Sequence, residues 1–139
     1  MKIDKLFEGL VRIANGDYVM QGDLVVEGDL EIDLDDRFVV KGKIEVSGGI
    51  SAGRGISAGW GISAGRGISA GDGISAGDGI SAGNGISAGR GISAGWGISA
   101  GFRIFAGISS FHSRENCIKT IKCKSLLHGE ICYGDLIIE

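Results

Sequence analysis

Few side chains in this 139-residue chain are of the types that perform acid–base or nucleophilic chemistry. The two histidines, His112 and His128, lie near the C-terminus, and so do the three cysteines, Cys117, Cys123 and Cys132. The cysteines and His128 offer the ligand types of a zinc site, but they lack the close Cys-x2-Cys pair that marks such sites. We therefore expect no catalytic residue, no metal and no cofactor, and a protein that is not an enzyme.

Composition narrows the class of protein further. With 27 glycines, no proline and 43% hydrophobic residues, the chain fits neither collagen nor a disordered segment. A formal net charge of −3 argues against general binding to nucleic acid or to an anionic membrane. The chain shows no apolar run of transmembrane length and no signal-peptide core, and its cysteines are odd in number. These features predict a cytoplasmic protein.

The elements that position the remaining side chains follow from a repeat. The pentamer Gly-Ile-Ser-Ala-Gly occurs nine times at an unbroken period of six between residues 49 and 101. Such a period is typical of a solenoid, and two glycines per unit disfavour a helix. Strand alternation places Ile and Ala on one face and Ser on the other, and Gly-x-Gly turns the chain with glycine at positive φ and x pointing outward. Each hexad is thus predicted to be a three-residue strand plus a corner.

The same register begins upstream of the perfect copies. From residue 16 onward apolar residues keep the two inward positions, with a two-residue insertion around residues 34–37. The predicted inward ladder starts at Tyr18, Leu24, Leu30, Phe38, Ile44 and Ile50 and continues to Ile104. We predict one all-β domain over residues 1–139, with regular coils over 16–108 and an irregular C-terminal coil over 109–139.

Charge decides how many hexads close one coil of this parallel β-helix. With two hexads per coil Arg54 would stack directly on Arg66, which is unfavourable. With three, Asp72 stacks between Arg54 and Arg90. The sequence therefore favours 18 residues per coil and about five coils.

The first fifteen residues are predicted to form an α-helical cap. Their apolar residues follow helical spacing: Ile3, Leu6, Phe7, Leu10 and Ile13. Asp4 is a suitable N-cap, and Asn15-Gly16 a suitable C-terminal stop. The alternative is a free amphipathic helix for a membrane or a partner, although charges of both signs on its polar face weigh against it.

Two families share parts of the pattern. The chain resembles the hexapeptide-repeat acyltransferases in period and aliphatic spacing, but Arg54, Trp60 and Asp72 stand where that family has a small inward residue. The resemblance therefore leaves the handedness of the coil open. Residues 16–50, with Gly-Asp-Leu-Val-Val-Glu-Gly-Asp-Leu, are similar to the bactofilins, which implies end-to-end polymers as one alternative.

The residues that differ between repeats form the candidate binding set. These outward residues are Arg54, Trp60, Arg66, Asp72, Asp78, Arg90, Trp96 and Phe102, joined by Asp35 and Asp36 of the insertion. Tryptophan and arginine are enriched at binding hot spots. Residues 1–48 hold eleven acidic and six basic residues, which indicates an acidic edge. The alternative is that corner side chains lie flat on neighbouring turns and that the carboxylates are merely solvated.

A small, acidic, single-domain chain with variable corners is similar in type to the immunity proteins of contact-dependent growth inhibition. That resemblance implies stoichiometric binding of a cognate bacterial toxin, with a basic nuclease domain as the expected partner. The alternatives are a self-assembling structural solenoid and an ice-binding protein with serine ladders. Known ice-binding solenoids favour threonine, and this weighs against the last.

Overall fold

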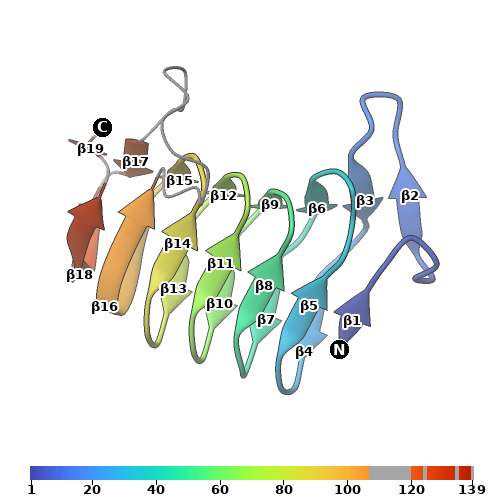
Figure 1. Cartoon of the computed structure of the whole chain (residues 1–139), viewed down its shortest axis with the longest axis horizontal. Coiled ribbons are helices and arrows are strands. Elements are labelled where there is room, and N and C mark those ends of the chain that lie inside the picture. Colours follow the sequence, from blue (N-terminus) through green and yellow to red (C-terminus); the bar gives the residue numbers. More distant parts are fainter. Residues whose placement is uncertain (107–119, 124, 134, 139) are drawn as a thin grey trace.

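The computed structural model describes residues 1–106, 120–123, 125–133 and 135–138. The chain is an all-β parallel solenoid of about five coils (Figure 1). Parallel pairing joins residues 18 apart, as in Ile56 with Ile74 and Ile74 with Ile92, so three hexads close each coil. The prediction of 18 residues per coil is confirmed.

The strands stack into three faces of a prism. The first face contains β4 (Leu24–Val26), β7 (Ile44–Val46), β10 (Ile62–Ala64), β13 (Ile80–Ala82) and the first half of β16 (Gly97–Ala106). The second contains β1 (Lys2–Ile3), β5 (Leu30–Ile32), β8 (Ile50–Ala52), β11 (Ile68–Ala70), β14 (Ile86–Ala88) and the second half of β16. The third contains β2 (Leu10–Arg12), β3 (Tyr18–Met20), β6 (Phe38–Val40), β9 (Ile56–Ala58), β12 (Ile74–Ala76), β15 (Ile92–Ala94), β17 (Thr120–Cys123) and β19 (Asp135–Ile138).

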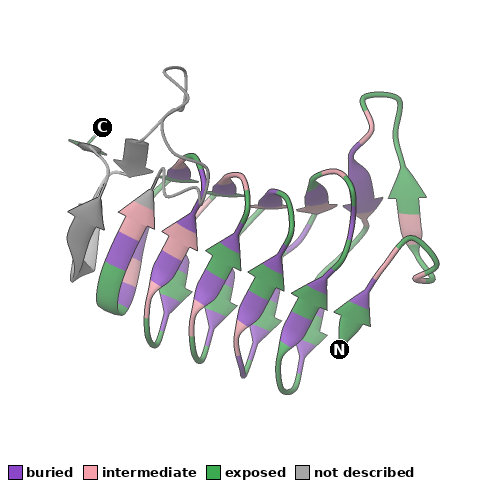
Figure 2. Cartoon of the chain, viewed as in Figure 1, coloured by how far each residue is buried: buried purple, intermediate pink, exposed green. Residues whose placement is uncertain are grey.

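Strand alternation builds the core as predicted. In each perfect hexad Ile and Ala are buried, while the Ser between them faces outward (Figure 2). Isoleucine stacks on isoleucine in register, for example Ile62 with Ile80 and Ile80 with Ile98. The predicted inward ladder from Tyr18 to Ile104 is confirmed, because all of its described members are buried.

The corner glycines serve a different purpose from the predicted one. Positive φ angles occur only at Gly9, Gly16, Gly22 and Gly28 in the described residues, and none of these lies in a perfect repeat. From the second perfect repeat onward the first glycine of Gly-x-Gly lies against the backbone of the preceding coil: a Cβ on Gly77 would overlap the carbonyl oxygen of Gly59. Close stacking of the corners, rather than left-handed backbone, therefore requires glycine there.

The insertion lengthens one coil by two residues. Tyr18 pairs with Phe38, twenty residues away, whereas Phe38 pairs with Ile56 at the regular separation of eighteen. Within the insertion Leu34 turns into the core and is 6% exposed, while Asp35 remains outside. The register is thus restored before the perfect repeats begin.

The predicted N-terminal helix is wrong, because this segment forms strands. β1 pairs in parallel with β5, and β2 pairs antiparallel with β3. Asp4 Oδ1 accepts a hydrogen bond from the Leu6 amide and starts a turn, not a helix. Gly16, with φ of 98°, sits in the connection between β2 and β3.

The prediction failed because the spacing of apolar residues in this segment is compatible with strands as well as with a helix. Ile3 is buried, but Leu6 is 90% exposed and Ile13 42% exposed, so no continuous apolar stripe faces the core. The first coil offers unpaired strand edges, and pairing with them satisfies backbone groups that a separate helix would leave open.

The C-terminal strands extend the same stack. β17 pairs with β15, β19 pairs with β17, and β18 (Ser125–Tyr133) pairs with β16 with shifts of register. Residues 107–119, which contain His112 and Cys117, lie outside the described residues. In the part of the chain that the structure describes, no helix is long and apolar enough to cross a bilayer.

Candidate partner-binding surface

The variable residues of the repeats fall into three columns, one at each corner of the prism. Between the third and first faces lies the tryptophan corner, which consists of Trp60, Asp78 and Trp96. Between the second and third faces lies the arginine corner, which consists of Arg54, Asp72 and Arg90. Between the first and second faces lies the Phe102 corner, which consists of Arg66, Asn84 and Phe102. The ten predicted site residues therefore do not converge on one site.

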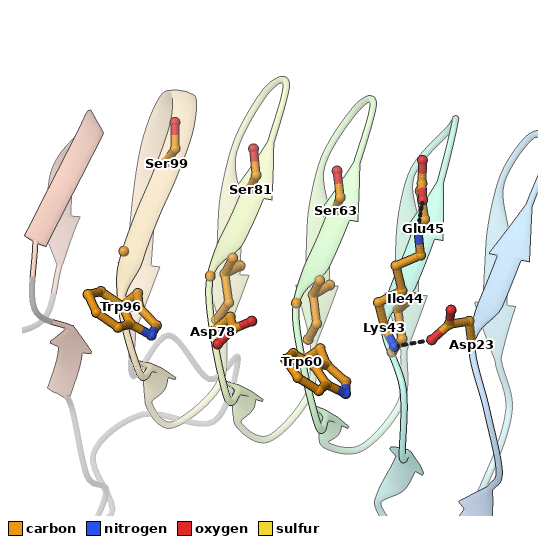
Figure 3. A pocket seen from close by; sticks show the side chains of 15 residues that line it. Asp23, Lys43, Ile44, Glu45, Trp60, Ser63, Asp78, Ser81, Trp96 and Ser99 are labelled. Atoms are coloured by element: carbon orange, nitrogen blue, oxygen red, sulfur yellow. Dashed lines mark hydrogen bonds and ion pairs between the residues drawn. The ribbon is translucent and has the colours of Figure 1, made fainter.

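The tryptophan corner presents two large aromatic side chains to solvent. Trp60 is 62% exposed and Trp96 61% exposed, so more than half of each residue's surface is accessible to solvent. The backbone beneath them is fixed, because the Asp78 amide donates to the Trp60 carbonyl at 2.9 Å and the Trp96 amide to the Asp78 carbonyl at 3.0 Å. The indoles are thus held two coils apart with a carboxylate on the coil between them (Figure 3).

A groove of about 880 Å³ runs along the first face beside this corner. Besides the corner residues, it is lined by the serine ladder and by charged residues of the earlier coils: Ser63, Ser81, Ser99, Asp23, Lys43 and Glu45. Figure 3 shows the serines farther along each strand from the tryptophans. The groove therefore combines aromatic, hydroxyl and carboxylate groups on a rigid sheet.

Two of the groove carboxylates already have partners. Lys43 Nζ lies 2.8 Å from Glu45 Oε2, and this contact raises the pKa of Lys43. Asp23 Oδ1 accepts a hydrogen bond from the Lys43 amide at 2.9 Å. Sequence reasoning did not assign Lys43 or Glu45 to a site, although their outward positions in the hexad would have indicated this surface.

At the arginine corner one aspartate lies near two arginines, so the corner keeps a net positive charge. Asp72 lies 3.8 Å from Arg54 Nη1 and 3.7 Å from Arg90 Nε, so the predicted placement between two arginines is confirmed. A smaller groove of about 440 Å³ lies beside it on the third face. Exposed ion pairs of this kind contribute at most about 1 kcal/mol each to stability. They show that residues 18 apart lie next to each other, and they add little to the stability of the fold.

The Phe102 corner carries a single charge, that of Arg66. Asn84 takes the central position, with its amide donating to the Arg66 carbonyl, and the Phe102 amide donates to the Asn84 carbonyl. The Phe102 side chain is 68% exposed, so this predicted site residue also faces solvent.

Of the two acidic residues predicted at the insertion, Asp35 holds the N-terminal segment. Asp35 accepts hydrogen bonds from Lys5 Nζ and from the Tyr18 hydroxyl, both at 2.8 Å. The contact with Lys5 and then that with Tyr18 lower the pKa of Asp35 to about 2, and the hydrogen bond to Asp35 raises the pKa of Tyr18. Asp36 Oδ1 accepts from the Arg37 amide in the same turn. These contacts give Asp35 a structural role, and its role in binding stays a prediction.

Within the described residues, no group of three or more His, Cys, Asp or Glu is placed to hold a metal ion. The zinc alternative rests on Cys117, Cys123, His128 and Cys132, whose side chains lie outside the described part of the structure. Comparison of the chain with protein-family models, with curated proteins and with solved structures found no match.

Proposed function

We propose that this chain is a protein-binding solenoid that acts by stoichiometric docking and not by catalysis. The observation that carries the proposal is the pair of indoles at Trp60 and Trp96, more than three-fifths exposed and anchored on a hydrogen-bonded β framework beside the groove. Tryptophan is the residue type most typical of binding hot spots, and a rigid scaffold reduces the entropy lost on association. The binding surface is thus the tryptophan corner together with the first face.

The charge of the groove supports a basic partner. Among the described residues, its charged lining consists of Asp23, Glu45, Asp78 and Lys43, three negative charges against one positive charge. Complementary charge speeds encounter and selects against acidic partners. In its specific form the proposal is that the chain is an immunity protein that binds a cognate bacterial toxin, a basic nuclease, in the cytoplasm.

The test uses the product of the reading frame adjacent to that of this chain as the candidate toxin. The wild-type chain should form a one-to-one complex with it on size exclusion and restore growth of cells that produce it. Replacing both tryptophans (Trp60→Ala, Trp96→Ala) should weaken binding roughly 30-fold or more, the scale of a lost hot spot. Val11→Ala is the control: it shortens an exposed apolar side chain on β2, outside the groove, and should bind as the wild type does. Full binding by the double variant would contradict the proposal.

End-to-end self-assembly is a second candidate, and the ends of the prism favour it. The outer edges of β2 and β19 have no pairing strand among the described residues. Exposed apolar residues lie on these strands: Val11, 59% exposed, on β2 and Leu136, Ile137 and Ile138 on β19. Unprotected strand edges of this kind are templates for pairing with another chain.

A further inference from the structure

Two corners of the prism repeat one arrangement around a central aspartate. On the arginine corner Asp72 has arginines on the coils before and after it, within 3.8 Å and 3.7 Å. On the tryptophan corner Asp78 takes the corresponding position between Trp60 and Trp96. The first corner thus shows that a guanidinium one coil away reaches an aspartate at this position of the repeat.

No cation of the described residues forms an ion pair with Asp78. Of the described residues that line the groove Lys43 is the one basic residue, and it lies against Glu45 instead. Asp78 is partly buried, so water screens its charge less than that of a fully exposed carboxylate. The described residues therefore supply no cation to Asp78, and its charge can be complemented by a cation that a ligand brings.

The spacing of the coils brings such a cation close to both indoles. Neighbouring strands lie about 4.8 Å apart, so a cation held at Asp78 is about that distance along the prism axis from each tryptophan. Cation–π attraction acts within roughly 6 Å of the ring centre. A guanidinium suits both contacts at once, because its edge donates hydrogen bonds to a carboxylate while its flat faces stack on aromatic rings. A lysine ammonium is a compact, strongly hydrated charge without such faces.

We propose that Trp60, Asp78 and Trp96 form a binding site for an arginine side chain of a protein partner. Asp78 accepts N–H groups of the guanidinium, and the two indoles pack against it. The site rests on the protein-binding function proposed above and names the chemistry that this surface recognises.

Short peptides isolate this contact from the rest of an interface. The chain has only two tryptophans, so indole fluorescence and the two indole N–H signals in NMR spectra report on this corner alone. The full chain is titrated at low salt with a blocked Gly-Arg-Gly peptide and with the corresponding citrulline and lysine peptides. Citrulline keeps the shape of arginine without its charge. The arginine peptide should shift both indole signals, and the other two should bind several-fold more weakly or not at all.

Two substitutions with matched chemistry test the role of the carboxylate. Asp78→Asn should weaken binding of the arginine peptide roughly tenfold or more, which is the scale of a hydrogen bond to a charged group. Asp72→Asn removes the same charge from the arginine corner and should leave peptide binding unchanged. Melting curves of both variants check that the solenoid remains folded.

Several outcomes would overturn the inference: equal binding of the arginine and citrulline peptides, equal binding of the lysine peptide, or equal losses in the two variants. Its failure is distinguishable from failure of the proposed function. If the wild-type chain does not bind the arginine peptide but the tryptophan substitutions abolish toxin binding, the proposed function stands and the arginine site is wrong. If the wild-type chain binds the arginine peptide but the double tryptophan variant still binds the toxin, the arginine site stands and the proposed function is wrong.

Discussion

In the perfect repeats, glycine at the start of every corner except the first is required by the distance between coils. A Cβ on Gly71 would overlap the carbonyl oxygen of Gly53 in the preceding coil, and the same contact recurs at Gly77, Gly83 and Gly89. Gly53 itself has nothing within 4 Å of such a Cβ, since the coil before it carries the insertion at this corner. Gly53 and Gly71 occupy the same position at the same corner, but the preceding coil crowds Gly71 and leaves space beside Gly53.

At the residue scale we predict opposite effects of alanine at these two positions. Gly71→Ala should destabilise the fold by about 1–3 kcal/mol, because the backbone of two coils must separate to admit the methyl group. Gly53→Ala should change stability by less than about 1 kcal/mol, and in the stabilising direction, because alanine restricts the unfolded chain. Urea unfolding of both variants measures the difference. Equal destabilisation would show that glycine is needed for backbone conformation instead.

At the scale of elements, the N-terminal strands are held by a small set of polar contacts. Lys2 Nζ lies 2.8 Å from Asp33 Oδ2, and the N-terminal ammonium donates to the Asp29 carbonyl at 2.6 Å. Asp35 joins Lys5 to Tyr18 through its two oxygens. β1 and β2 thus cover the starting edges of the second and third faces, while no described strand pairs with the outer edge of β4 on the first.

The lowered pKa of Asp35 predicts how these strands respond to acid. Its pKa is about 2 in the folded chain, below its ordinary value of 3.8, because of Lys5 and then Tyr18. Its contribution to stability is therefore complete above about pH 5 and is lost as the pH falls toward about 2. We expect the free energy of unfolding of the wild type to exceed that of Asp35→Asn at about pH 5 and to approach it at about pH 2. A difference that does not change with pH would rule out the ionised contact.

At the scale of the whole molecule, the prism has three dissimilar corners and two ends. Partner binding uses a corner and a face, whereas self-assembly uses the ends, so the two candidate functions involve different surfaces. Both are compatible with the same rigid stack of coils. Substitutions at one surface should leave the other function intact.

End-to-end assembly predicts sedimentation that depends on protein concentration. Val11→Lys places a charge on the exposed edge strand β2 and should shift the population toward monomer, since edge lysines prevent strand pairing. Ser75→Lys, on β12 in the middle of the third face, is the control and should not change the sedimentation. A monomer at all concentrations would contradict this candidate and leave protein binding as the function.

The sequence alone determined the solenoid, its core and its columns. A strict period of six with Ile and Ala at alternating positions makes burial a local matter, so the ladder from Tyr18 to Ile104 follows from the pattern. The charges of Arg54, Asp72 and Arg90 determined the number of hexads per coil, because stacked neighbours must be compatible. The outward position of Trp60 and Trp96 followed from the same alternation.

Only the tertiary structure decided the N-terminus, the role of the glycines and the groove. The spacing of apolar residues in the first fifteen positions is compatible with a helix. Strands form instead because β1 pairs with β5, about 29 residues away, and β2 pairs with β3, which the rest of the stack holds in place. The glycine contacts and the groove likewise join residues eighteen or more positions apart. Such contacts depend on the distance between stacked coils, and this distance cannot be inferred from a local pattern of residue types.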